Sequence, residues 1–398
     1  MKRLSSVAGL LLALLLLAGC WNYREMNELA FALAEGVDKI PGTNEYRMSF
    51  QIVNAQEIAG IKATGKTPVV VYTGTGNSLF EAVRNASQKV ARRINSQHLR
   101  IFVIGEALAK ESIEEILDLI ERDPEPRMTT RVFIARNATA ESILRTLTPL
   151  ELIPANAILG KLKVSGKVLG ESYETPVPDI IRGLMSKSGN PVISGIRLVG
   201  NKELGQSSDN MKQTVSSALL QVNGMALFRK GKLVDWASGD TARGISYINN
   251  KMRSTVEGLD CRDKKNAVSV ELLRSKTNLK ASFEGDRPVF RVHIHQIGNI
   301  EEVMCAVDLS KSAQIHAYEQ DWSEETKRIV LAGIKKSKQL NTDVIGFGDA
   351  VKRSFPKTWK KMEKEWDAIF PTCKVEVEVD STIRRTGIVS SPYKLKKE

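Results

Sequence analysis

The chain has 398 residues, with 58 Lys and Arg against 46 Asp and Glu and a formal net charge of +12. This length exceeds what one hydrophobic core usually serves, so we expect two or three domains. The positive charge favours anionic partners. Because we find no arginine-rich helix and no aromatic RNA-binding motif, lipid headgroups or acidic proteins are better candidates than nucleic acid. Four cysteines without CxxC spacing indicate neither a disulfide framework nor a zinc site.

The N-terminus has the layout of a bacterial lipoprotein signal. Two basic residues precede an apolar run from Val7 to Leu17, and Leu17-Ala18-Gly19-Cys20 places small residues directly before a cysteine. The run is too short to cross a membrane, which takes about twenty apolar residues. We therefore expect residues 1–19 to be a cleaved lipoprotein signal peptide. The alternative is an ordinary signal peptide with a chance cysteine.

Lipidation of Cys20 would anchor the mature chain. A thioether to diacylglycerol, with or without a further chain on the freed amino group, supplies two or three acyl chains. Each methylene buried in the bilayer contributes about 0.8 kcal/mol to membrane binding. Without residues 1–19 the chain keeps 56 basic and 46 acidic residues, a net charge of +10. We expect a water-facing body, lipid-anchored to the outer face of the cytoplasmic membrane.

Strand-like and helix-like runs alternate in the first region, which we delimit as an N-terminal α/β domain over residues 20–196. Ser78 lies three residues before Glu81, and this capping box predicts the start of an amphipathic helix. Further helices are predicted over 111–121 and from about 139–141. Strands are predicted over 30–38, 46–52, 69–72, 99–104 and 131–135.

Prolines and glycines punctuate residues 172–220, and we place a domain boundary near residue 196. The apolar runs 225–228 and 233–236 flank a basic, glycine-containing turn, which predicts a hairpin in a small β-rich middle domain over 197–263.

The C-terminal domain, 264–398, is predicted to combine a long helix with a basic tail. Its strands are expected over 267–274, 289–297 and 375–379, and its helices over about 322–340 and 356–370. The fold class is therefore α+β, with mixed and antiparallel sheets flanked by helices.

Two sequence patterns resemble ligand-binding sites, but each is better explained by an ordinary structural role. The run Gly74-Thr75-Gly76-Asn77-Ser78 lies where a phosphate loop would sit, but it lacks a third glycine and a Gly-Lys-Ser/Thr ending, so we interpret it as a turn with a helix cap. His293 and His295 project from one strand face as paired metal ligands would. Without a third ligand nearby, a solvent-facing strand is the better interpretation.

The chain offers little for catalysis. Its four histidines have no GxSxG or HExxH context, and His98 precedes a buried strand, where a structural role is expected. We predict no catalytic residues, no cofactor and no metal. At most one bridge can form among Cys261, Cys305 and Cys373, and buried free thiols are our preferred interpretation.

Two segments near the C-terminus carry further candidates. Residues 343–348, which include Gly346 and Gly348, predict a turn that fixes Phe347 between helices; an exposed ligand loop is the alternative. Arg384 and Arg385 would face opposite sides of a continuing strand. We interpret them, like the tail lysines, as solvated, with the membrane or an acidic partner as the alternative. The tail lysines are Lys394, Lys396 and Lys397.

Several of these segments, in this order, resemble one family from end to end: the Ger(x)C spore germination lipoproteins, which are C subunits of nutrient germinant receptors. Asn22 stands where that family usually has Asp. The similar segments are 19–27, 97–101, 223–229, 233–236, 243–244, 343–348 and 383–387. The resemblance implies a three-domain α/β body without known catalytic activity on the outer face of the spore inner membrane. It implies two partners, a multi-pass A subunit and a permease-like B subunit.

We therefore expect a non-enzymatic receptor subunit that acts through subunit assembly and signal relay. The alternative is a substrate-binding lipoprotein of a transporter, which would have two similar lobes around a deep polar cleft. A membrane-tethered hydrolase is a third candidate, which lacks a triad or metal context.

Overall fold

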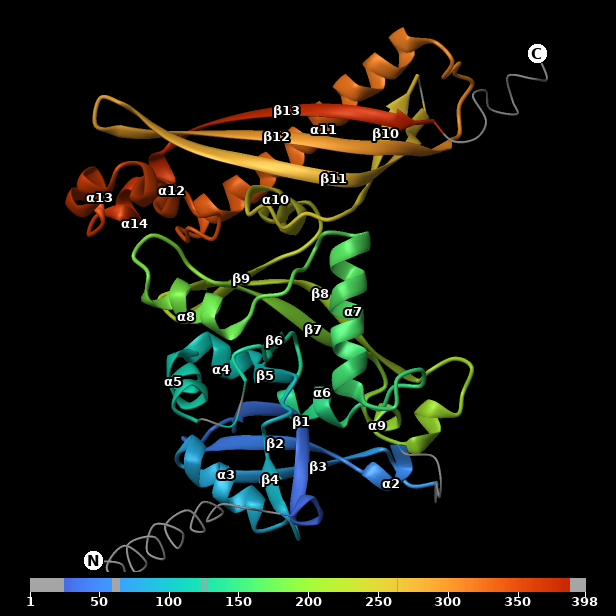
Figure 1. Ribbon diagram of the computed structural model, residues 1–398, viewed down its shortest axis with the longest axis vertical. Helices are drawn as coiled ribbons and strands as arrows, with labels where there is room; N and C mark the ends of the chain where they lie inside the picture. Colours follow the sequence, from blue (N-terminus) through green and yellow to red (C-terminus); the bar gives the residue numbers. More distant parts are fainter. Residues whose placement is uncertain (1–24, 59–64, 124, 126, 263, 387–398) are drawn as a thin grey trace, which may run out of the picture.

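The computed structural model describes residues 25–58, 65–123, 125, 127–262 and 264–386. The molecule is elongated, with its first strands at one end and a separate sheet, built from the last third of the chain, at the other (Figure 1). A nine-stranded sheet has the order β3-β2-β1-β5-β6-β7-β8-β9, with β4 paired to β1, and a four-stranded sheet has the order β10-β11-β12-β13. The expected α+β class with mixed sheets is confirmed.

Parallel strands form the centre of the first sheet. β1 pairs in parallel with β5, β5 with β6 and β6 with β7, while hairpin-like antiparallel pairs extend both edges. All five residues of β5 are buried, as expected for a strand covered by helices on both faces. The strands are β1 (Leu29–Lys39), β2 (Tyr46–Val53), β3 (Val69–Gly76), β4 (Arg93–Asn95), β5 (Ile101–Gly105), β6 (Arg131–Ala135), β7 (Val192–Gly200), β8 (Ala218–Arg229) and β9 (Lys232–Ala237).

Helices pack on both faces of this sheet. One hydrophobic core lies beneath α3, α4, α5 and α8, and another beneath α6 and α7. The helices are α2 (Ala55–Ile58), α3 (Leu79–Ser87), α4 (Glu106–Glu111), α5 (Glu114–Arg122), α6 (Ala140–Arg145), α7 (Pro154–Val168), α8 (Val177–Met185) and α9 (Lys202–Gly205), with 3-10 turns η2 (Met26–Glu28) and η3 (Ser208–Met211). The predicted helix 111–121 is wrong at its start, because Ser112 breaks it into α4 and α5.

Local signals in the sequence act as predicted at two places. The Ser78 side chain caps α3 by accepting a hydrogen bond from the Glu81 backbone N–H, and the Glu81 carboxylate accepts one at 2.8 Å from the N–H of Asn77, the residue before the cap, so the box forms with its return bond shifted by one residue. The β8–β9 hairpin turns at Lys230 and Gly231, both with positive φ, which suits a two-residue turn.

The second sheet is built on an unusually long hairpin. β11 and β12 pair antiparallel along most of their length, and β13 pairs in parallel with β12. The helix α11 packs along this sheet and against α10. The elements are α10 (Asp240–Ile248), β10 (Val256–Cys261), β11 (Lys264–Glu284), β12 (Arg287–Val303), α11 (Ser312–Gln339), α12 (Phe347–Ser354), α13 (Pro356–Met362), α14 (Trp366–Ile369), η4 (Phe370–Thr372) and β13 (Lys374–Arg385).

Our preference for free thiols at all three downstream cysteines is wrong. Cys261 and Cys305 form a disulfide, while Cys373 is a buried free thiol. The physical reason is strand register. Cys261 ends β10 and Cys305 follows β12, and both strands flank β11, so antiparallel pairing brings the two cysteines to the same end of the sheet.

The division into domains at residues 196 and 263 stays a prediction. Strands β8 and β9 of the expected middle part extend the sheet that begins with β1, whereas α10 of that same part packs on α11 beside the second sheet. The segment 197–263 therefore connects the two sheets.

Candidate functional site at the junction of the two sheets

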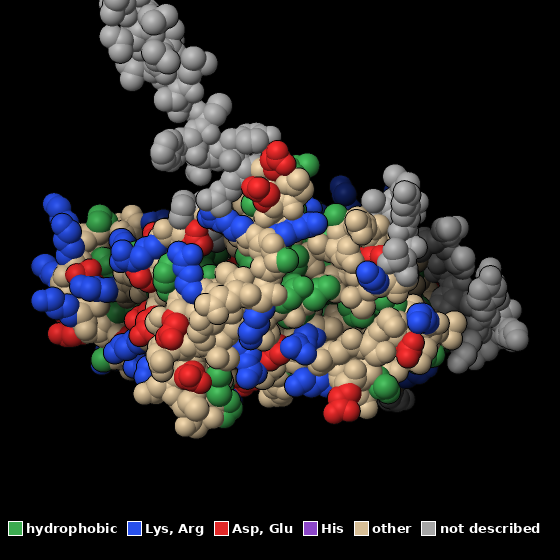
Figure 2. Space-filling model, turned by 90° about the horizontal axis from the view of Figure 1, so that it is seen from below, with side chains coloured by type: hydrophobic (Ala, Val, Ile, Leu, Met, Phe, Trp, Pro, Cys, Tyr) green, Lys and Arg blue, Asp and Glu red, His purple; other side chains and the backbone are tan. Residues whose placement is uncertain are grey.

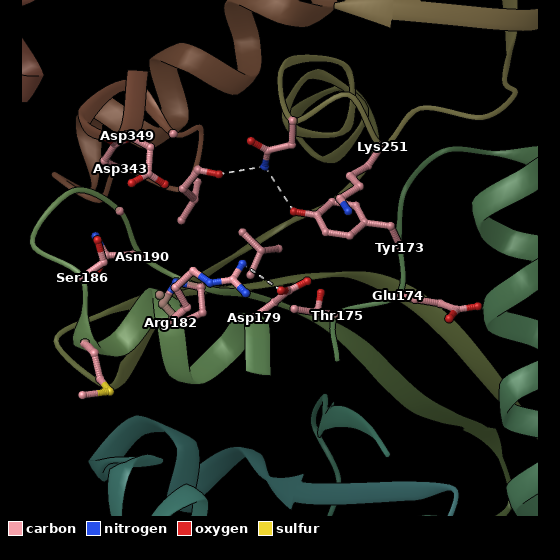
Figure 3. Close-up of a pocket in the computed structure, with 18 of the residues that line it drawn as sticks. Tyr173, Glu174, Thr175, Asp179, Arg182, Ser186, Asn190, Lys251, Asp343 and Asp349 are labelled. Carbon is pink, nitrogen blue, oxygen red and sulfur yellow. Dashed lines mark hydrogen bonds and ion pairs between the residues drawn. The ribbon is translucent and has the colours of Figure 1, made fainter. Parts of the chain in front are cut away.

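A cavity of about 540 Å³ lies where the first sheet meets the helices of the second (Figure 3). Its lower wall is α8 and the loop after it, its upper wall is the segment around Asp343 and Asp349, and residues after α10 close one side. The volume falls within the range of about 300–1,000 Å³ that small-molecule sites occupy. Three parts of the chain that are remote in sequence therefore share one pocket.

Asp343 organises the upper wall. Its buried carboxylate accepts hydrogen bonds from the backbone N–H of Phe347 at 3.1 Å and of Gly348 at 2.7 Å, and from the Trp366 indole N–H at 3.1 Å. Its backbone oxygen accepts a bond from the Asn190 N–H at 2.8 Å across the junction. Burial raises the pKa of Asp343 to about 6, and the three hydrogen bonds oppose that rise.

The turn predicted before Phe347 is confirmed, but the ring packs on strand β12 and not only between helices as expected. Gly346 has a φ of +73°, which glycine adopts without strain, and the Phe347 ring stacks on Phe290 of β12 with centroids 4.1 Å apart. A Cβ on Gly348 would lie 2.4 Å from the Ser188 carbonyl oxygen, so this glycine allows the loop after α8 to approach. The motif thus fixes a ring in the core and joins the two sheets.

The cavity lining carries both charges. Asp179 and Arg182 form an ion pair at 3.1 Å on α8, and the Ser188 hydroxyl donates to Asp349 from the lower wall. The side-chain amide of Asn249 donates to the Tyr173 hydroxyl at 3.2 Å and to the Val344 oxygen at 2.8 Å. Burial raises the pKa of Tyr173 to about 12. Such a lining suits binding of a polar molecule or of water.

Ion pairs and hydrogen bonds tie the two sheets together around the cavity. Asp367 pairs with both Arg229 and Lys230 at 3.3 Å, at the β8–β9 turn. Thr342 donates to the Phe228 backbone oxygen, and Lys336 of α11 pairs with Asp235 of β9. A movement of one sheet would break several of these contacts, so the junction couples the two parts of the molecule.

The other candidate segments have structural roles. Gly74 and Gly76 lie in β3 under α3, and a Cβ on Gly74 would come 2.2 Å from the Ala82 carbonyl oxygen, so glycine allows the helix to lie on the strand. His98 packs edge-on against Phe31, with centroids 5.5 Å apart. Neither segment contributes to the junction cavity.

The exposed histidines and arginines are also placed. His293 and His295 lie on the exposed face of β12, and His293 Nε2 is 2.6 Å from Asp380 Oδ2. Within the described part of the chain, His, Cys, Asp and Glu side chains form no group of three that suits a metal. Arg384 and Arg385 are both exposed at the end of β13. Cys20 and the tail lysines lie outside the described residues.

Sequence reasoning missed most of the cavity. Tyr173, Asn190 and Asn249 carry no motif, and only the run of prolines and glycines over 176–195 marks their region as irregular. The sequence of the Asp343 motif predicts its turn, but it carries no signal for the contact with Asn190.

The described residues contain no helix with both the length and the apolar character to cross a membrane.

Two family models match the sequence. The model described as "Spore germination protein N-terminal domain" matches residues 22–198, and the model described as "Spore germination B3/ GerAC like, C-terminal" matches residues 223–387. The two matches cover most of the chain.

Relatives match over nearly their full length. Spore germination protein KC of Bacillus subtilis (strain 168) is 34% identical over 392 residues, which are 97% of this chain and 96% of that protein. Spore germination protein B3 of the same organism is 24% identical, over 98% of this chain and 100% of that protein. The crystal structure of the GerBC protein aligns with a TM-score of 0.56 at 18% identity, covering 88% of this chain and 98% of that one, which shows a shared fold.

Proposed function

Because the chain belongs to the spore germination B3/GerAC-like family, we propose that it is the C subunit of a spore nutrient germinant receptor, needed for nutrient-triggered germination. The observation that carries this proposal is similarity to Spore germination protein KC along nearly the whole of both chains. Its proposed action is assembly with other subunits and relay of a signal between them.

We propose that the subunit is not an enzyme. The relatives are named for spore germination rather than for a reaction. The lining of the junction cavity supports this proposal, because the described residues that form it include no histidine and no cysteine.

The partners and the location follow from the receptor role. We propose that the subunit assembles with a multi-pass A subunit and a permease-like B subunit at the outer face of the spore inner membrane. Acylated Cys20 would hold it there, since the lipobox precedes the described body directly.

A relay suits the junction better than a transporter's binding site does. A transporter's binding protein would have two similar lobes, whereas here a nine-stranded and a four-stranded sheet of different topology meet. The cavity between them is crossed by bonds such as Asn190 N–H to Asp343 O, and these couple the sheets.

The test is deletion of the gene in its own spore-forming strain. We expect loss of nutrient-triggered germination with normal growth and sporulation, and recovery when the wild-type gene is restored. Normal germination on every nutrient tested, in a strain with no redundant receptor, would overturn the proposal.

A further inference from the structure

A second, larger cavity of about 860 Å³ lies between α3 and α5 on the first sheet. Its floor consists of side chains from the sheet strands, among them Met48, Phe50 and Phe102, which are at most 2% exposed. The helices supply further apolar walls, including Val83 and Leu119, and Phe80 at the rim is 57% exposed. None of the described residues that line this cavity lines the junction cavity.

Arginines surround the opening. Arg84, Arg92, Arg93 and Arg122 line the cavity. Arg93 pairs with Glu125 at 2.8 Å and Arg122 pairs with Asp118 at 2.8 Å. The guanidinium carbon of Arg84 lies 4.8 Å from the centroid of the Phe80 ring. Within the described ranges, neither Arg84 nor Arg92 forms an ion pair with an acidic side chain. Two guanidinium groups are therefore available to an anion beside an exposed aromatic ring.

The inner end of the cavity is polar. The buried Glu35 carboxyl accepts a hydrogen bond from the Ser96 hydroxyl. Asp123 and Glu125 also line the cavity, where Asp123 is exposed and Glu125 is paired with Arg93. Glu35 is therefore the acidic group at the buried end, whereas Arg84 and Arg92, which have no acidic partner, are exposed. An anionic head group is favoured at the rim, and an apolar chain is favoured against the floor.

The cavity lies at the end of the molecule where the chain begins. Arg93 and Ile94 belong to β4, which pairs with the first residues of β1. Figure 2 looks onto this end and shows apolar side chains among many Lys and Arg side chains. Four residues lie between Cys20 and Glu25, the first described residue, so a fully extended chain would join the two Cα atoms over at most about 18 Å.

We propose that this cavity binds an anionic membrane phospholipid, with its phosphate on Arg84 and Arg92 and part of an acyl chain on the floor formed by Phe50 and Phe102. The proposal rests on the membrane tether in the proposed function, because Cys20 would hold this end of the molecule at the lipid surface. The second contact fixes the orientation of the body, which a flexible tether alone does not.

The test uses the acylated full-length protein in vesicles that contain phosphatidylglycerol with a photoactivatable group in its acyl chain. After illumination, mass spectrometry locates the lipid label. We expect label on peptides from α3 and α5, and at least about tenfold less in Arg84→Glu/Arg92→Glu. The matched control is Lys163→Glu/Lys167→Glu, the same charge change on exposed positions of α7, which should label like wild type.

An apolar pair of variants tests the chain contact separately. Phe80→Ser should lower the label, whereas Leu150→Ser, at a position 97% exposed outside the cavity, should not. Three results would overturn the proposal. They are no label on α3 and α5, equal label in the two charge variants, and equally strong label when the photoactivatable lipid is phosphatidylcholine instead of phosphatidylglycerol. Cross-links from these helices only to another protein would also overturn it, in favour of subunit docking.

This experiment separates the two proposals. A wild-type protein that stays in the membrane and supports germination, but shows no label at the cavity, removes the lipid site and leaves the receptor role. A deletion strain that germinates normally removes the receptor role, whatever the label shows.

Discussion

Gly244 of α10 and Gly333 of α11 lie backbone against backbone. A Cβ on Gly244 would come 2.3 Å from the Ile329 carbonyl oxygen, and a Cβ on Gly333 would come 2.9 Å from the Gly244 carbonyl carbon. Since α10 and α11 both contribute to the core of the second sheet, this pair sets how closely the two helices approach each other.

Gly244→Ala should therefore destabilise the protein by about 1–3 kcal/mol, because the added methyl meets backbone that cannot rotate away. Thermal unfolding followed by circular dichroism measures the change. Gly160→Ala on α7 is the control: nothing lies within 4 Å of its Cβ, so alanine should stabilise that helix by about 0.5–1 kcal/mol. Equal effects of the two variants would contradict the close approach.

Asp343→Asn should lower the stability of the protein by about 1–3 kcal/mol. The carboxylate accepts hydrogen bonds from three N–H groups, and the amide nitrogen of asparagine would face at least one of these donors without accepting from it. The fluorescence of the tryptophans should also change, since Trp366 loses its acceptor. Asp286→Asn, at an exposed position in the turn between β11 and β12, is the control and should change stability by less than about 0.5 kcal/mol. If Asp343→Asn unfolds at the same temperature as the wild type, the hydrogen bonds described for Asp343 do not hold the junction together.

Glu35 predicts a pH dependence of stability. Burial raises its pKa from 4.5 to about 7, with its hydrogen bond from Ser96 opposing the rise. Between these two pKa values the folded state holds a proton that the unfolded state releases. The contribution of Glu35 to the free energy of unfolding is therefore complete below pH 4.5 and is lost as pH rises through 7. The pKa difference corresponds to a loss of about 3 kcal/mol of stability.

Glu35→Gln should flatten the unfolding free energy between pH 4.5 and 7 and raise it at pH 8 relative to wild type. Denaturant titrations at several pH values measure this. Glu121→Gln, exposed on α5, serves as the control and should follow the wild-type curve. An unchanged slope in Glu35→Gln would contradict the buried carboxyl.

The disulfide predicts a thiol count. Acylated, denatured and unreduced protein should react with one equivalent of alkylating reagent, at Cys373, and with three after reduction. In the native protein Cys373 should stay unreactive, because burial raises its pKa to about 12. Replacing Cys261 and Cys305 by serine should cost about 2–4 kcal/mol of stability. Three reactive thiols before reduction would contradict the bridge.

Cys20→Ala should release the protein from the membrane. The acyl chains are the proposed anchor, and a basic surface alone gives salt-sensitive attachment. Fractionation of cells expressing the wild-type or variant gene, with salt washes, measures this. Unchanged retention of the variant after a high-salt wash would contradict lipidation as the anchor.

The sequence predicted those elements whose signal is local. The alternation in β2 and the apolar run of β5 mark strands because one or both faces are buried. The outer half of β11 lies beyond the predicted strand because polar Ser275 and Thr277 interrupt the core face after Arg274; the apolar alternation resumes only at Leu279, Ala281 and Phe283. The helix α7 was missed because Val164 and Val168 are apolar yet exposed, which blurs its periodicity.

The candidate site could be predicted only in part. The Asp343 segment has two glycines around an aromatic residue, which indicates a turn without any tertiary information. Its contact with Asn190 joins positions that are far apart in the chain, and only the packing of the two sheets brings them together. The disulfide was missed for the same reason, because strand register brings Cys261 to Cys305.

The β11–β12 hairpin sets how far the subunit reaches. β11 has 21 residues, and at about 3.4 Å per residue it extends roughly 70 Å across the molecule at the end opposite the chain's first strands (Figure 1). Under the proposed tether at Cys20 and the proposed lipid contact, this hairpin would lie farthest from the lipid surface. Short extracellular loops of a membrane-embedded protein would then contact β1–β4, whereas contact with the hairpin would need a protein with a sizeable domain outside the bilayer.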